Sequence, residues 1–166
     1  GRESGSLGVG APPPPGGGGG GRREGGGGGG RPAVPDVTHD LFLAARAAMA
    51  RAHAPYSRFP VGAALRTADG RIYAGANVEN ASYPEGWCAE TTALAHYVMG
   101  GGGEITDIVV LAEHMDRITP CGGCRQRLAE FAQPEARLHL CDRNGVVETV
   151  TIGAMLPHGF SGEVLT

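Results

Sequence analysis

The sequence contains no lysine and no apolar run of the roughly 20 residues that a membrane-spanning helix needs. Residues 1–3 are not followed by an apolar stretch either, so we expect neither a membrane span nor a signal peptide. All 14 basic residues are arginine, which, with the high content of alanine and glycine, suggests a GC-rich coding sequence. Four cysteines without a secretory signal indicate metal or catalytic use in the cytoplasm more than a disulfide framework.

Glycine and proline are unevenly distributed along the chain. Residues 1–35 hold 16 of the 30 glycines and 6 of the 12 prolines. The larger apolar side chains there are Leu7, Val9 and Val34, too few to offset the entropy of ordering the segment. We therefore predict a disordered tail over 1–35, not collagen-like because its glycines run in blocks, and one domain over 36–166.

Positive charge and aromatic residues are both scarce in the predicted domain. The tail carries four arginines against two acids, whereas residues 36–166 carry 10 against 15, so that 10 − 15 = −5. The chain has one tryptophan. Nucleic-acid surfaces need basic and aromatic tracks, so we expect no nucleic-acid partner.

Apolar periodicity and chain breakers predict an α/β domain. An amphipathic helix is expected from Thr38, as its N-cap, to about His53. The other expected elements are strands over 61–67 and 71–77, a helix over 88–99, a buried strand over 105–112, a helix over 121–131, and strands over 138–141 and 146–151. Their order predicts a mixed five-stranded sheet with helices on its faces.

Three of the four cysteines stand at the starts of two expected helices. Cys88 precedes Glu90 by two residues, and Cys121 and Cys124 form a C-x-x-C pair after a proline. Backbone N–H groups at a helix start lower the pKa of a thiol and favour the thiolate that binds zinc. Three protein ligands leave the fourth zinc position open to water, which is the arrangement of catalytic zinc. This layout is that of zinc nucleobase deaminases, with Cys in place of the first His.

Simpler interpretations of the cysteines remain open at this point. A lone C-x-x-C pair is more often a structural zinc half-site or a redox pair than a catalytic site. A structural zinc site needs a fourth ligand, but Cys141 falls in a short strand where a buried thiol is the ordinary expectation. None of the six histidines lies at ligand spacing from a cysteine, and we expect them at the surface or satisfied in the core. The joint pattern favours catalysis.

Four ordered motifs carry a family resemblance. They are YSRFPVGAA at 56–64, NVENASY at 77–83, CAE at 88–90 and PCGGCRQ at 120–126. In these motifs the region from about 38 to 165 resembles the small, homotetrameric cytidine deaminases of free nucleosides. The resemblance implies a three-layer α/β/α domain with one zinc per subunit. It also implies conversion of cytidine or deoxycytidine to uridine or deoxyuridine with release of ammonia, a reaction of pyrimidine salvage.

The resemblance also implies roles for individual residues. Cys88, Cys121 and Cys124 would ligate zinc, which activates water for attack on C4 of the pyrimidine. Glu90 would carry protons from the water to N3 and then to the leaving amine.

The implied substrate contacts lie on several elements. Asn77 and Glu79 would bind the ribose hydroxyls, and Phe59 would lie against the base. The remaining contacts would come from the backbone of Ala89 and Thr119 at the base edge, and from Tyr83 and Phe160 completing a neighbouring subunit's site.

One position departs from the family pattern. Thr91 follows Glu90 where many members carry an arginine that offsets the charge of three thiolates on Zn²⁺, a sum of 2 − 3 = −1. Our hypothesis is that Arg125, with the two helix N-termini, compensates through hydrogen bonds around the ligands.

Rival functions follow from these features. The arginine is also absent in blasticidin S-type deaminases, so another aminopyrimidine nucleoside is the nearest rival substrate. Nucleic-acid or nucleotide deaminases usually begin their motif with His and need phosphate-binding tracks. A catalytically silent, zinc-stabilised binding protein would keep the cysteines but would not need Glu90. The sequence does not distinguish ribose from deoxyribose.

Overall fold

The computed structural model describes residues 36–165, and the tail predicted over 1–35 lies outside the described residues. The helices are α1 (Asp36–Met49), α2 (Ala89–Met99), α3 (Gly122–Phe131) and α4 (Ile152–Met155), with short 3-10 turns η1 (Tyr83–Glu85) and η2 (Gly162–Leu165). The strands are β1 (Val61–Thr67), β2 (Ile72–Ala76), β3 (Ile105–Ala112), β4 (Arg137–Asp142) and β5 (Gly145–Thr151). The expected order of elements is confirmed, and α4 and the two turns are additions to it. No helix within 36–165 is long and apolar enough to cross a membrane.

The five strands form one mixed sheet in the order β2-β1-β3-β4-β5. β3 and β4 are parallel, joined by α3 as a crossover, and the other neighbours are antiparallel. The sheet is covered on both faces, and the central strand β3 is accordingly apolar over most of its length. Ile108, Val109, Val110 and Leu111 of β3 are all fully buried.

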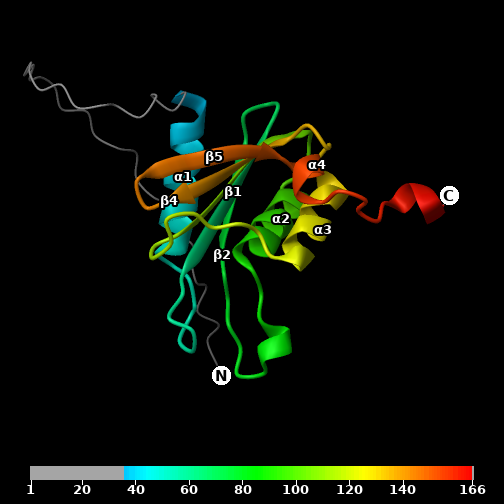
Figure 1. Ribbon diagram of the computed structural model, residues 1–166. Helices are drawn as coiled ribbons and strands as arrows, with labels where there is room; N and C mark the ends of the chain where they lie inside the picture. Colours follow the sequence, from blue (N-terminus) through cyan, green and yellow to red (C-terminus); the bar gives the residue numbers. More distant parts are fainter. Residues whose placement is uncertain (1–35, 166) are drawn as a thin grey trace, which may run out of the picture. The chain divides into compact units, whose positions relative to one another are not determined.

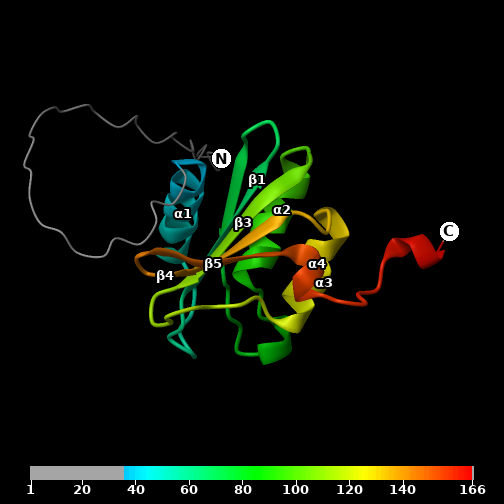
Figure 2. The same ribbon diagram turned by 45° about the horizontal axis from the view of Figure 1, so that its top comes forward.

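Helices lie on both sides of this sheet, which gives the predicted three layers. α1 covers one face, while α2 and α3 lie together on the other (Figure 1). The helices α2 and α3 both begin close to the edge where β3 ends and β1 begins. After α4 the C-terminal segment extends away from the sheet (Figure 2).

The limits predicted for α1 are wrong at both ends. The helix begins at Asp36, so Thr38 is not its N-cap but a buried residue of the first turn. At the other end the helix stops at Met49, because the backbone of His53 instead pairs with the segment around Val78. Such long-range pairing is invisible to helical periodicity.

Candidate active site

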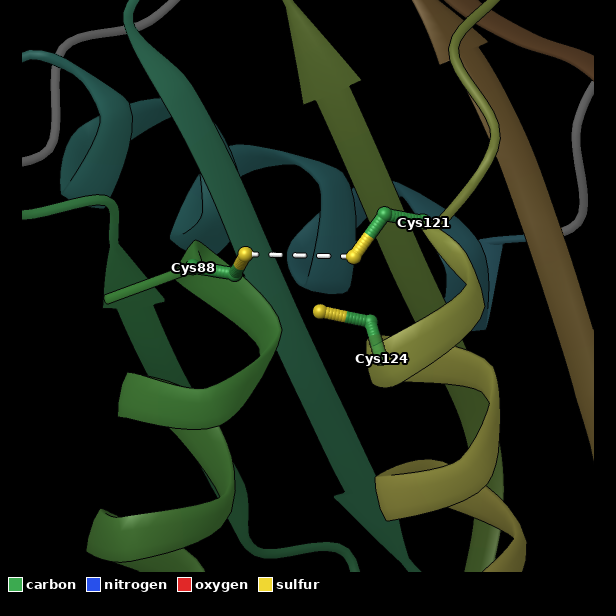
Figure 3. Close-up of side chains that lie close together, drawn as sticks. All are labelled: Cys88, Cys121 and Cys124. Carbon is green, nitrogen blue, oxygen red and sulfur yellow. Dashed lines mark hydrogen bonds between the residues drawn. The ribbon is translucent and has the colours of Figure 1, made fainter. Parts of the chain in front are cut away.

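The structure brings three cysteines from two helix starts into one cluster. Cys88 is the N-cap of α2 and Cys121 the N-cap of α3, both with extended backbone dihedrals and neither side chain used for capping. Cys124 lies in the first turn of α3 and is fully buried. The three sulfurs point toward one another from the two helices (Figure 3). Because neither Cys88 nor Cys121 uses its sulfur to cap a helix, both sulfurs are available to bind an ion.

The spacing of the sulfurs fits one zinc ion. The three Sγ atoms lie within 4.8 Å of one another, and those of Cys88 and Cys121 are 4.0 Å apart. Sulfurs that ligate one zinc ion tetrahedrally, each about 2.3 Å from it, are about 3.8 Å apart. Because only three side chains converge here among the described residues, a fourth position is left for a small molecule.

The electrostatics of the cluster follow from burial and from the short distances between its thiols. A hydrogen bond from the Cys124 thiol lowers the pKa of Cys88 to about 6, although burial opposes this. The same contact and burial raise the pKa of Cys124. The hydroxyl of Thr91 lies 4.0 Å from Sγ of Cys124. Cys88 is therefore the more acidic of these two thiols.

Glu90 lies beside the cysteines in the first turn of α2. Its residue surface is 4% exposed, and burial raises the pKa of its carboxyl group. Its own backbone N–H, the Cys124 thiol and the charge of Arg127 act in the opposite direction. Cys88 stands outside the helix, so that both its sulfur and the Glu90 carboxylate face the same space, as the extended dihedrals of an N-cap allow.

A cavity of about 370 Å³ opens in front of the cluster. It has room for a small molecule and reaches both Cys88 and Glu90. Its lining includes eight of the residues proposed for the site: Asn77, Glu79, Tyr83, Cys88, Ala89, Glu90, Thr119 and Cys121. A second hollow of about 300 Å³ adjoins it, sharing Glu79 and Tyr83.

The polar side chains of the lining are held by the loop before β1. Oδ1 of Asn77 accepts from the Val61 N–H at 2.8 Å, and its Nδ2 donates to the Phe59 carbonyl at 3.0 Å. The Ser57 hydroxyl donates to Oε1 of Glu79. Of the influences on Glu79, that hydrogen bond is the strongest, and it holds the pKa of the carboxyl below its usual range.

Sequence reasoning missed two parts of this arrangement. Trp87 and Val78 exchange two backbone hydrogen bonds of 2.8 Å, which fasten the segment carrying Asn77 and Glu79 to the residue before Cys88. The second part is the Ser57 hydroxyl, which donates to Glu79. The sequence motif around Ser57 did not indicate this role. The signal for Trp87 was that it is the only tryptophan and directly precedes a ligand.

Four proposed residues lie outside the single-chain cavity or at its rim. Phe59 contributes its carbonyl to Asn77 but does not line the cavity. Tyr83 and Phe160 are 75% and 62% exposed, and the Phe160 carbonyl accepts a hydrogen bond from Gln126 of α3. Nε of Arg125 donates to the Pro120 carbonyl at 3.0 Å, just before Cys121.

Comparison with known proteins agrees with this geometry. A family model described as the cytidine and deoxycytidylate deaminase zinc-binding region matches residues 36–139. The chain is 40% identical over 126 residues to a cytidine deaminase of Sporosarcina psychrophila, covering 76% of this chain and 93% of that protein.

Solved structures give the same result. A crystal structure of cytidine deaminase from Burkholderia pseudomallei is 45% identical with a TM-score of 0.70, covering 74% of this chain and 98% of the other. A cytidine deaminase structure from Mycobacterium tuberculosis is 37% identical with a TM-score of 0.66, covering 74% and 95%.

Proposed function

The chain belongs to the cytidine deaminase family and is a zinc-dependent cytidine deaminase, and from that membership we propose the roles of its individual residues. The observation that carries the proposal is the meeting of three cysteine sulfurs and a buried carboxylate at one cavity. Cys88, Cys121 and Cys124 hold the zinc ion. When bound, zinc supplies an activated water for attack on C4 of the pyrimidine.

Glu90 is the group that moves protons in this site. Its carboxylate lines the cavity next to Cys88 and is largely shielded from bulk solvent, so it can exchange protons with a bound substrate. It takes a proton from the attacking water and gives it to N3, and later protonates the amine at C4 as that bond breaks. Water and cytidine are consumed, and uridine and ammonia are released.

Substrate is oriented by groups at the opposite end of the cavity. Asn77 retains one N–H beyond its bond to Phe59. Glu79 accepts from the Ser57 hydroxyl and from the N–H groups of Tyr56 and Ser57, which leaves one acceptor site at Oε1. Both can therefore bind ribose hydroxyls.

We assign the base edge to the N–H of Ala89 and the carbonyl of Thr119, since both residues line the cavity. Phe59 remains our candidate for the contact with the ring, although it does not line the cavity of the single chain. We include deoxycytidine as a substrate, and the named relatives favour cytidine over a blasticidin S-type substrate.

The experiment that tests these roles is Glu90→Gln, with Glu130→Gln on the exposed side of α3 as the matched control. Glu90→Gln should keep one zinc per chain and the same thermal unfolding temperature but lose turnover, followed by the decline of cytosine absorbance. The control should match the unmodified enzyme in all three measurements. A Glu90→Gln protein that still deaminates cytidine would overturn the proton-transfer role. A zinc-free wild-type enzyme with full activity would overturn the metal site.

We further propose that the enzyme works as a homotetramer in the cytoplasm. Tyr83 at the cavity rim and Phe160 on the extended C-terminal segment are large, exposed aromatic side chains, and Met99 at the end of α2 is 87% exposed. Apolar groups of this size gain by burial against another copy, where Tyr83 and Phe160 would complete a neighbouring cavity. A cytoplasmic location keeps the three thiols reduced and available to zinc.

Native mass spectrometry tests the assembly. Four chains and four zinc ions are expected, and Phe160→Ala should raise KM in the assembled enzyme. A fully active, zinc-loaded monomer would contradict the tetramer.

A further inference from the structure

A hollow of about 550 Å³ lies beside α1, on the face of the sheet opposite the zinc cluster. It is bounded by α1, by the loop that follows β3 and by the turn between β4 and β5, which lies close to α1 in both views (Figure 1 and Figure 2). We call it the α1 hollow, and the lining residues that matter below are Thr38, Phe42, Arg46, Leu111, Arg143 and Val146. Within the described part of the chain it shares no lining residue with the catalytic cavity. The proposed deamination therefore leaves it without a role.

Part of the lining is apolar. Phe42 of α1 and Leu111 of β3 come from the core on this face, and Val146 of β5 packs against that core. Leu43 also lines the hollow and is 44% exposed. A volume of this size with an apolar lining and a few polar groups is typical of sites for small molecules. An apolar ligand group would be removed from water here, which is favourable.

Two arginines give the α1 hollow a positive charge. Arg46 of α1 and Arg143 of the β4–β5 turn line it and are exposed, and among the described residues neither side chain has a hydrogen bond or an ion pair. The acidic residue of the lining is Glu113, which lies 4.0 Å from His114. With His39 and His114 neutral, the formal charge of the lining is 2 − 1 = +1. The predicted domain carries −5, so this positive charge is local and opposite in sign to the whole.

The hydroxyl of Thr38 is a buried polar group of the same lining. Thr38 is 7% exposed and lies in the first turn of α1. Its hydroxyl makes no hydrogen bond within residues 36–165. A buried hydroxyl without a partner is costly, so a ligand that accepts a hydrogen bond from it would recover free energy. The hydroxyl thus favours an acceptor in the hollow, as the two arginines do.

We propose that the α1 hollow binds a small organic phosphate. Arg46, Arg143 and the Thr38 hydroxyl bind its phosphate group, and its apolar body lies on Phe42. Guanidinium groups match phosphate oxygens in geometry and form charge-assisted hydrogen bonds with them. A phosphate offers three strong acceptor oxygens to these three donor groups, whereas a carboxylate offers two. An inorganic anion would leave the apolar lining in contact with water, and an uncharged apolar molecule would leave both arginines and the hydroxyl without partners.

Isothermal titration calorimetry of the full, zinc-loaded chain with phenyl phosphate tests the proposal. Uridine, the product of the proposed reaction, is kept at saturation so that the probe does not enter the catalytic cavity. One site per chain is expected. Inorganic phosphate, benzoate and benzyl alcohol each lack one part of the probe, and each should bind at least about tenfold more weakly, as when a charged hydrogen bond or an apolar ring is lost.

Substitutions locate the site. Arg46→Gln and Arg143→Gln should each raise the Kd for phenyl phosphate about tenfold, as for a lost hydrogen bond between charged groups. Arg51→Gln, at an exposed position just after α1 and outside the lining, is the matched control and should bind like the wild type. Thr38→Val should raise the Kd roughly threefold. It should not lower the unfolding temperature of the ligand-free protein, because the hydroxyl that it removes has no partner there.

Three outcomes would overturn the proposal. They are a Kd for phenyl phosphate weaker than about 1 mM, equal affinity for one of the three comparison compounds, and wild-type affinity in both Arg46→Gln and Arg143→Gln. None of these results bears on the zinc site, because the α1 hollow and the catalytic cavity are lined by different residues of the described chain. In turn, a Glu90→Gln enzyme that still deaminates cytidine would leave this proposal standing.

Discussion

Asp107 of β3 and Arg137 of β4 form a two-pronged ion pair across adjacent strands. Nε of Arg137 donates to Oδ1 at 2.7 Å and Nη2 donates to Oδ2 at 2.9 Å. Nε2 of His139 contacts the same Oδ1 at 2.9 Å, while its Nδ1 contacts the Thr149 hydroxyl at 2.8 Å. One carboxylate therefore links strands β3, β4 and, through His139, β5.

This network predicts how stability depends on acid pH. Burial disfavours the Asp107 carboxylate, but the hydrogen bonds from Arg137 and His139 outweigh it and lower its pKa to about 2. The pKa is about 3.9 in an unfolded chain, so the native state holds the proton less tightly. The resulting stabilisation, about 2 kcal/mol, is complete above about pH 5 and is lost as the pH falls toward 2.

Urea unfolding of the wild type and Asp107→Asn between pH 6 and pH 2 measures this effect, because other carboxyl groups cancel in the comparison. The wild type should be more stable at pH 6, and the difference should narrow steadily below pH 4. A difference that stays constant with pH would show that Asp107 does not contribute through its charge.

The elements of the fold could be predicted where local signals decide them. β3 is predicted over its full length because most of this buried central strand is apolar, and α2 and α3 begin where their cysteines indicate. The end of α1 could not be predicted, because it is set by the pairing of His53 with Val78, which is distant in the sequence.

In the site, too, some features follow from local sequence signals and others only from the three-dimensional structure. Which residue types gather at the cavity follows from the motifs, whereas the contacts that hold them depend on three-dimensional packing. Ser57 illustrates the limit, because its place in the motif does not show that its hydroxyl donates to the Glu79 carboxylate.

Ser57→Ala tests how Glu79 is positioned. The Ser57 hydroxyl donates to Oε1 of Glu79 and also accepts from the Phe59 N–H at 3.0 Å, so its loss removes both bonds. Oε2 of Glu79 is still held by the N–H groups of Tyr56 at 2.8 Å and Ser57 at 3.2 Å. KM for cytidine should rise roughly three- to tenfold with kcat nearly unchanged, as for a lost hydrogen bond to a charged group. Ser82→Ala is the control, since the Ser82 hydroxyl makes no cap bond to the η1 turn. A fall in kcat as large as the expected rise in KM would instead assign Ser57 a role in the chemical step.

Gly75→Ala tests how closely α2 must approach the sheet. A Cβ atom at Gly75 of β2 would lie 2.3 Å from the backbone nitrogen of Ala93 and 2.7 Å from the carbonyl oxygen of Ala89. These are backbone atoms of α2 that cannot turn aside, so the helix carrying Cys88 must move. We expect a loss of about 3 kcal/mol in unfolding free energy, measured in urea, together with weaker zinc binding.

The matched control for Gly75 is Gly122→Ala. Gly122 separates two zinc ligands in the sequence, yet a Cβ built there meets nothing within 4 Å. Stability and zinc content should therefore be close to wild type. If Gly75→Ala is tolerated as well as Gly122→Ala, then α2 does not pack against β2 as closely as these distances indicate.

Removal of residues 1–35 tests whether the glycine-rich segment matters for catalysis. Every residue assigned to zinc or substrate lies between Phe59 and Phe160, and α1 begins at Asp36, so the deletion leaves the first core helix whole. We expect unchanged zinc content and unchanged kcat/KM for cytidine. A deletion extended through Phe42 provides the contrast, because it removes Leu41 and Phe42, which are buried against the sheet. The longer deletion should lower the unfolding temperature sharply, whereas a loss of kcat/KM on removing residues 1–35 alone would assign the segment a part in activity that the catalytic geometry does not require.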